Sequence, residues 1–178
     1  IFTSQAISFI EKNSQGPFFC YLAFNAPHTP LQVPDKYFNM YKDIDPSQGF
    51  EKRMKPQIPM SEKDKEDARR VYAMVSNIDE NVGRVLKKLD DLRLAENTVV
   101  IFMTDNGPQQ RRYVAGMRGL KGSVYRGGVR VPFWLRYPAL KKSNVDIEVT
   151  AAHIDVLPTL ATICNTPIPV DRKIDGVD

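Results

Sequence analysis

The sequence lacks several features that would place it in an easily recognised class. Its 178 residues include only 2 cysteines, Cys20 and Cys164, too few for a disulfide framework. No apolar run reaches membrane-spanning length, so we expect no segment to cross a bilayer. The chain also lacks an initiator methionine and a visible signal peptide, and it starts inside a helical pattern. We therefore interpret it as an excised piece whose targeting sequence has been removed.

The composition is that of a globular protein. Hydrophobic residues make up 42% of the chain, and its length is sufficient for one domain with a core. The 25 lysines and arginines against 21 aspartates and glutamates give a net charge of +4. This charge is too small and too scattered to argue for a nucleic-acid partner, whereas it is compatible with an anionic substrate.

Two apolar runs predict buried strands of a parallel sheet. Thr98–Met103 and Phe18–Phe24 are continuous apolar segments without polar alternation. In such sheets ligands bind beyond the carboxyl ends of the strands. The first run leads to Asp105 and Asn106, and the second leads to His28. If the two strands are parallel, His28 and Asp105 share one edge of the sheet.

The side chains of Asp105 and Asn106 indicate a metal site. They offer only hard oxygen ligands, which favour Ca²⁺ or Mg²⁺ over Zn²⁺. Gly107 lets the backbone turn tightly beside an ion. The alternative is a plain Asp-Asn-Gly turn after a strand, which is common in proteins.

The segment that follows is basic and rich in glycine. Five glycines in Pro108–Gly128 are interleaved with basic side chains. Together with Arg130, which follows this range, the basic residues are Arg111, Arg112, Arg118, Lys121 and Arg126. This composition suits an anion, because glycine lets backbone N–H groups approach it closely. A nucleic-acid surface is the alternative, but the neighbouring oxygen-only metal candidate fits a single-anion pocket better.

Two helices are predicted before this region. Apolar residues at helical spacing predict a helix from Phe2 to about Asn13. The pattern Ser61-x-x-Asp64 resembles a capping box and precedes a long amphipathic helix. We expect Gly83, inside this helix, to permit close packing against a neighbouring element.

The remaining segments complete the expected order of elements. Leu31–Pro59 predicts a long surface excursion with short helical pieces, a kind of loop that often carries function, although a solvated connector is the alternative. Val131–Tyr137 predicts a third strand, and Val145–Thr150 predicts a half-exposed strand. Ile154–Cys164 predicts a final helix in which Asp155 serves as the N-cap rather than as a functional group.

Five motifs occur along the chain in the following order: Asn25-Ala26-Pro27-His28-Thr29-Pro30, Asp105-Asn106-Gly107, Arg118-Gly119-Leu120-Lys121-Gly122, Gly127-Gly128-Val129-Arg130-Val131-Pro132 and His153-Ile154-Asp155-Val156-Leu157-Pro158-Thr159-Leu160. The ordered set resembles the sulfatase family of the alkaline-phosphatase-like superfamily. The resemblance covers nearly the whole chain.

The resemblance implies both a fold and a set of roles. The fold would be α/β, a three-layer sandwich with a central, largely parallel sheet flanked by helices, of which residues 1–178 form a single partial domain. By family match, His28 and Lys121 contact the sulfate group as catalytic residues, and Arg118 binds substrate. Asp105 and Asn106 would be the metal ligands, for Ca²⁺ with Mg²⁺ as the second choice.

The chain departs from the family pattern at its nucleophile. Sulfatases use a formylglycine made from Cys or Ser in a Cys/Ser-x-Pro-x-Arg motif, and the sequences after Cys20 and Cys164 fit no such motif. The family's first metal-binding aspartates and its Lys-x-His segment are also absent, and Arg126 stands where many sulfatases carry an acidic residue. We therefore expect the second part of a catalytic domain, inactive alone, with an exposed sheet edge that favours self-association.

Two alternatives to a sulfatase stay open at this point. One is a phosphatase or phosphodiesterase of the same superfamily, although those two-metal sites usually place histidine where this chain has Asn106. The other is a non-catalytic binding module. The sequence does not indicate whether the substrate is a sulfated glycan, a steroid sulfate or an aryl sulfate. By resemblance alone, the parent protein would be exported to the periplasm, the lysosome or the cell exterior.

Overall fold

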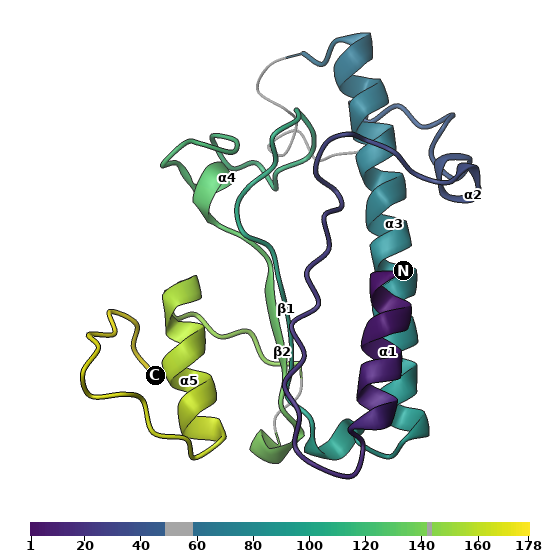
Figure 1. Cartoon of the computed structure of the whole chain (residues 1–178). Coiled ribbons are helices and arrows are strands. Elements are labelled where there is room, and N and C mark those ends of the chain that lie inside the picture. The colour runs from purple at the N-terminus through teal and green to yellow at the C-terminus, as the bar shows by residue number, and fades with distance from the viewer. Residues whose placement is uncertain (49–58, 142–143) are drawn as a thin grey trace. The chain divides into compact units, whose positions relative to one another are not determined.

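The computed structural model describes residues 1–48, 59–141 and 144–178. Part of the predicted Leu31–Pro59 excursion, residues 49–58, therefore lies outside the described residues. The chain divides into two compact units, Ile1–Leu140 and Lys141–Asp178, which we describe separately (Figure 1). None of the described helices is both long enough and apolar enough to cross a membrane.

The first unit is built along the long helix α3 (Glu62–Asp91). Its 30 residues correspond to a length of about 45 Å. The predicted capping box is confirmed: the Ser61 hydroxyl accepts the Asp64 N–H at 3.1 Å, and the Asp64 carboxylate accepts the Ser61 N–H at 2.9 Å. The close packing predicted at Gly83 is wrong, because a methyl group added there would meet no other atom within 4 Å.

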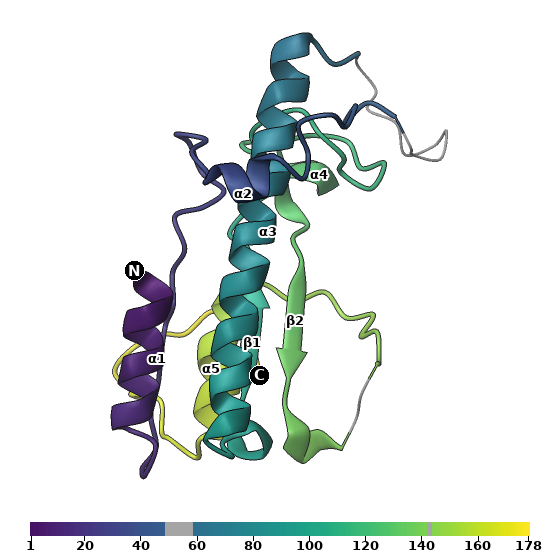
Figure 2. The same cartoon turned by 90° about the vertical axis from the view of Figure 1, so that its right-hand side faces the viewer.

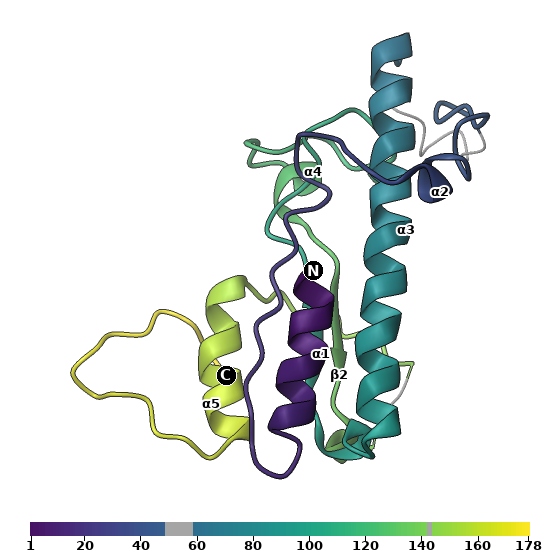
Figure 3. The same ribbon diagram turned by 45° about the vertical axis from the view of Figure 1, so that its right-hand side comes forward.

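Helix α1 (Phe2–Lys12) packs along the C-terminal half of α3, as Figure 1 and Figure 3 show. The helix predicted from Phe2 to about Asn13 is therefore confirmed. Ile10 of α1 is buried with Leu89 and Ala95 in a small apolar core, and Phe18 packs against it. Burial of these side chains holds the two helices together, and an ion pair between Lys88 and Glu11 at 2.7 Å adds to the contact.

The described part of the surface excursion is anchored to α3. It contains the short helix α2 (Asp35–Phe38), which confirms the prediction of short helical pieces. This helix contacts α3. Lys36 forms an ion pair with Glu80 at 3.1 Å. The Tyr41 hydroxyl and the Ser76 hydroxyl share a hydrogen bond of 2.6 Å. The excursion is thus a segment with its own attachment to the scaffold.

The sheet of the described residues consists of two strands. β1 (Val100–Met103) and β2 (Phe133–Arg136) are antiparallel, with Val100 opposite Arg136 and Met103 opposite Phe133. Both strands were predicted, but the expected parallel pairing is not present among the described residues. β1 is half-buried rather than covered on both faces, and β2 is largely exposed.

The segment Phe18–Phe24, which was predicted to be a strand, has an extended backbone but is not paired with a neighbouring strand. No backbone hydrogen bond joins these seven residues to any other described residue, and a strand is defined by such bonds to a neighbour. Phe19 and Tyr21 remain 74% and 78% exposed. In Figure 1 the segment nevertheless runs in the same direction as β1. The strand predicted at Val145–Thr150 is also absent.

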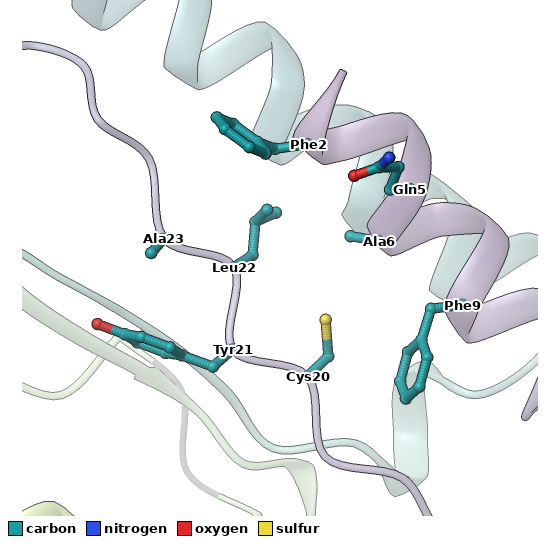
Figure 4. Close-up of a pocket in the computed structure, with 8 residues that line it drawn as sticks. All are labelled: Phe2, Gln5, Ala6, Phe9, Cys20, Tyr21, Leu22 and Ala23. Atoms are coloured by element: carbon teal, nitrogen blue, oxygen red, sulfur yellow. The ribbon is translucent and has the colours of Figure 1, made fainter.

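An open hollow of about 360 Å³ lies between α1 and this extended segment (Figure 4). Cys20 and Leu22 point toward α1, whereas Tyr21 points away from it, which is the alternation of an extended chain. Phe2 and Phe9 of α1 line the opposite wall. The lining carries no charged side chain, so the hollow lacks the chemistry of an anion site.

The second unit contains the short turn η4 (His153–Asp155) followed by helix α5 (Val156–Ile163). The final helix was predicted, and Asp155 does occupy its N-cap position, but the Asp155 side chain makes no capping hydrogen bond to α5, so the predicted N-cap role is wrong. Its carboxylate accepts the N–H of Val177 at 2.9 Å and that of Ala152 at 2.7 Å. These two hydrogen bonds lower the pKa of Asp155. Two further short turns belong to the first unit: η2 (Ala95–Asn97) and η3 (Pro138–Leu140).

Asp45 provides a test of how the excursion is attached. Its carboxylate accepts the Ser47 hydroxyl at 2.7 Å and the Ser47 N–H at 2.9 Å, and it pairs with Lys65 of α3 at 3.5 Å. These contacts, the Ser47 hydroxyl first, lower the pKa of Asp45 to about 2. A carboxyl whose pKa is lower in the folded chain stabilises the fold above its ordinary pKa, and that contribution is lost as the pH falls through about 2.

We predict that Asp45→Asn lowers the urea midpoint of unfolding at neutral pH. The difference from the unmodified chain should shrink below the ordinary pKa of 3.8 and vanish near pH 2. Asp43→Asn is the matched control, because Asp43 is exposed and makes no ion pair with the described residues. Equal midpoints for both variants at neutral pH would show that the Asp45 contacts do not stabilise the chain.

Candidate functional site

The candidate site is formed by three chain segments that follow β1. They are residues 105–108, residues 118–123 and residues 125–130, the last of which includes the short helix α4 (Arg126–Val129). We call them the loop assembly. Three backbone hydrogen bonds join them: Gly107 N–H to the Gly128 carbonyl at 2.8 Å, Lys121 N–H to the Pro108 carbonyl at 2.9 Å, and Gly127 N–H to the Arg118 carbonyl at 2.7 Å.

Glycine is required where these segments meet. A Cβ atom on Gly107 would lie 1.9 Å from the Gly127 carbonyl oxygen, and one on Gly127 would lie 2.2 Å from the Gly119 carbonyl oxygen. A Cβ atom on Gly128 would lie 2.2 Å from the Ser123 carbonyl oxygen. Any side chain would therefore separate the segments. The glycines of the sequence motifs serve backbone-to-backbone contact.

Asp105 and Asn106 stand at the start of the loop assembly. The Asn106 side-chain amide donates a hydrogen bond to the Asp105 carboxylate, so the amide oxygen of Asn106 stays available as a ligand. The Asp105 side chain is exposed. These oxygens fit a hard cation such as Ca²⁺, which normally takes six to eight oxygen ligands. No cluster of three or more His, Cys, Asp or Glu side chains occurs in the described part of the chain, so the two residues supply only part of such a set.

The loop assembly also carries two of the predicted substrate-binding residues. Lys121 is exposed, and its backbone bond to Pro108 holds it beside the turn that contains Asp105. The Arg118 guanidinium lies 3.8 Å from the centre of the Tyr125 ring, a cation–π contact that holds the arginine in place. Sequence reasoning did not single out Tyr125, since no spacing rule predicts which aromatic residue a loop arginine will stack on.

His28 lies in a different segment of the same unit. Its Nδ1 is 2.8 Å from the Thr29 carbonyl oxygen, which can only accept, so Nδ1 is the donor and Nε2 is left for another partner. The extended segment before His28 and strand β1 lead to the same end of the unit in Figure 1 and Figure 2. No hydrogen bond or ion pair among the described residues joins His28 to the loop assembly.

Arg111 and Arg112 are directed toward α3. Burial lowers the pKa of Arg112, and the neighbouring Tyr72 of α3 partly opposes that effect. Burial likewise raises the pKa of Tyr72. The charge of Arg111 helps to lower the pKa of Asp64, after the larger effect of the Ser61 hydroxyl. These two arginines therefore lie near charged or polar side chains of α3.

Comparison with known protein families identifies the family of this chain. The family model described as Sulfatase matches residues 1–166. The chain belongs to the sulfatase family. The predicted resemblance is thus confirmed.

The relatives of this sulfatase chain are considerably longer than the chain itself. Human steryl-sulfatase is 29% identical over 99% of the chain, which covers 28% of that protein. The endo-4-O-sulfatase of Bacteroides thetaiotaomicron is 28% identical over 93% of the chain, which covers 32% of that protein. The crystal structure of Ps i-CgsB in complex with k-i-k-neocarrahexaose superimposes with a TM-score of 0.79 at 27% identity, over 99% of this chain and 36% of that one.

The sulfatase chain therefore spans about a third of the length of these relatives. The structural match confirms the predicted α/β class of the alkaline-phosphatase-like type, here as a partial domain. The two antiparallel strands of the described residues are the part of its sheet that this chain forms by itself.

We predict that Gly107→Ala destabilises the chain by about 1–3 kcal/mol, because the new methyl group would overlap the Gly127 carbonyl oxygen. The free energy of unfolding from urea titration measures this. Gly83→Ala is the matched control: it lies in open space on α3, and we expect a gain of about 0.5–1 kcal/mol from its higher helix propensity. Two variants of equal stability would contradict the proposed packing at Gly107.

Proposed function

We propose that the protein containing this chain hydrolyses sulfate esters. The observation that carries the proposal is the geometry of the loop assembly. Its backbone places Asp105 and Asn106, whose side-chain oxygens suit a hard cation, next to Lys121, and this close packing of the backbone is possible only with glycine at the contact points. The sulfatase family match over residues 1–166 supports the same reaction. The proposal concerns the whole protein, since the chain spans about a third of its relatives.

In this proposal each residue has a defined task. Bound by Asp105 and Asn106, Ca²⁺ would supply positive charge that polarises the sulfate oxygens. Arg118 and Lys121 bind the sulfate anion, and the Lys121 ammonium stabilises negative charge on the ester oxygen as it leaves. When protonated, His28 Nε2 donates its proton to that oxygen as the sulfur–oxygen ester bond breaks.

The attacking group has to come from outside these 178 residues. Sulfatases use formylglycine, and neither Cys20 nor Cys164 lies in the motif from which it is made. Both cysteines are free and exposed in the structure. The isolated chain should therefore be inactive, because no group in it can form the covalent intermediate.

The substrate would be a sulfate ester, carried on a glycan or on an aryl group. The names of the relatives include sulfatases of both steroids and glycans, so they do not narrow the choice. We further infer from the family alone that the parent protein is exported. Detection of the native protein only in the cytosol after cell fractionation would be evidence against export.

The test uses the full-length protein and measures hydrolysis of p-nitrophenyl sulfate and p-nitrophenyl phosphate. We predict that Lys121→Ala, His28→Ala and Asp105→Ala each lower kcat/KM for the sulfate ester by about 10²–10³-fold. Lys42→Ala is the control, because Lys42 is an exposed lysine remote in sequence from the loop assembly.

The outcomes separate the proposed function from its alternatives. Hydrolysis of the phosphate ester in preference to the sulfate ester would indicate a phosphatase of the same superfamily. Hydrolysis of neither ester, with retained sulfate binding, would indicate a binding module. Loss of activity in Lys42→Ala equal to that in Lys121→Ala would remove the role assigned to Lys121.

We also propose that the isolated chain of 178 residues self-associates through Phe18–Phe24. The backbone N–H and carbonyl groups of this extended apolar segment have no backbone partner among the described residues, so a second copy can pair with it strand to strand. Light scattering should show a dimer or larger species for the chain. Tyr21→Pro, which removes a backbone donor, should shift it to the monomer.

Tyr125→Ala is the control for this prediction, since it removes an exposed tyrosine side chain that lies outside the segment. If Tyr21→Pro and the unmodified chain have the same mass in solution, the segment is not the contact.

A further inference from the structure

One residue pair of the loop assembly has a chemically labile sequence. Asn106 is followed by Gly107, and no other asparagine of the 178 residues precedes a glycine. In such a pair the backbone nitrogen of the glycine can attack the side-chain carbonyl carbon of the asparagine, because the glycine has no Cβ atom to hinder the approach. The sequence therefore marks Asn106 as the asparagine of this chain most prone to deamidation.

This reaction has two steps and needs only water. The Gly107 nitrogen forms a bond to Cγ of Asn106, the side-chain amide leaves as ammonia together with the proton from the Gly107 nitrogen, and a cyclic succinimide remains. Water then adds to either carbonyl of the ring. One opening gives aspartate. The other gives isoaspartate, in which the main chain runs through the former side chain and gains a methylene group.

The fold opposes the first step. The Gly107 N–H donates a hydrogen bond of 2.8 Å to the Gly128 carbonyl, so the attacking group is tied to a neighbouring segment. Gly107 is buried, and a Cβ atom on it would lie 1.9 Å from the Gly127 carbonyl oxygen. The leaving amide is also held, because Asn106 donates it to the Asp105 carboxylate. Attack by the nitrogen therefore requires the hydrogen bond to break and the closely packed backbone to separate.

We propose that Asn106 is a latent deamidation site, which the contact of Gly107 with the Gly127–Gly128 pair keeps unreactive while the loop assembly is closed. Opening of this contact exposes the site, and helix α3 stays folded when it does. Local opening of this kind needs less free energy than global unfolding. The lability is independent of sulfate-ester hydrolysis, since it requires no substrate and no group from outside the chain except water.

Either product changes the loop assembly permanently. Aspartate places a second carboxylate beside Asp105 in place of a neutral amide. Isoaspartate lengthens the main chain between β1 and Gly107, so the N–H of Gly107 no longer meets the Gly128 carbonyl in its present register. A brief opening of the glycine contact is thereby converted into a lasting modification.

The test uses the full-length protein at mildly alkaline pH and measures deamidation of individual asparagines by mass spectrometry of peptides. The folded protein is compared with the protein in urea. Gly128→Ala opens the contact, because its Cβ atom would lie 2.2 Å from the Ser123 carbonyl oxygen, and Gly83→Ala, in open space on α3, is the matched control. Asn13, which precedes Ser14 at the end of α1, reports global unfolding.

In urea, Asn106 should deamidate faster than Asn13. In the folded protein the rate at Asn106 should be at least about tenfold lower, because only the minor population with an open contact reacts. Gly128→Ala should raise the rate at Asn106 of the folded protein by about tenfold or more and leave the rate at Asn13 unchanged. Gly83→Ala should change neither rate.

A rate at Asn106 of the folded, unmodified protein within about twofold of the rate in urea would overturn the inference. This comparison decides the matter even if Gly128→Ala does not fold. If circular dichroism shows that variant to be folded, an unchanged rate at Asn106 would also overturn the inference. An equal rise at Asn13 in the folded variant would assign the protection to the fold as a whole rather than to the glycine contact, with the same consequence.

Discussion

The contact between Gly107 and the Gly127–Gly128 pair is the constraint on which the site depends. It joins the chain leaving β1 to the chain entering β2, at a distance that admits no side chain. The same two chains are already paired at Met103 and Phe133, so the intervening loop is closed twice, once by the sheet and once by glycine. Because of this double closure, a loop without regular secondary structure can present fixed side chains.

Features encoded by neighbouring residues could be read from the sequence. The start of α3 depends on hydrogen bonds between Ser61 and Asp64, three residues apart, and the prediction was correct to the residue. The N-cap role predicted for Asp155 failed, because its carboxylate accepts from Ala152 and from Val177, 22 residues away, and not from α5, so only the Ser61–Asp64 pair was read correctly from neighbouring residues. Local hydrogen bonding of this kind is independent of the rest of the fold.

Features that depend on distant partners could not be read in this way. Phe18–Phe24 has the composition of a buried strand, but composition does not supply the neighbouring strand that its backbone needs. Gly83 and Gly107 look alike in the sequence, yet one faces open space and the other touches a carbonyl oxygen. The proposed site residues come from ordered family motifs, whereas the contact of Tyr125 with Arg118 is visible only in three dimensions, because Tyr125 belongs to none of these motifs.

The attachment of the excursion to α3 has a consequence for how such a protein can diversify. Lys36 and Tyr41 hold the excursion through Glu80 and Ser76 of the helix, while the loop assembly is closed by its own backbone. The excursion and the glycine contacts are therefore held by different sets of bonds, although both segments reach Tyr72 of α3, the excursion through Tyr41 and the loop through Arg112. Because the glycine contacts do not use the bonds that hold the excursion, changes in the excursion can alter the surroundings of the loop assembly while its backbone closure is kept.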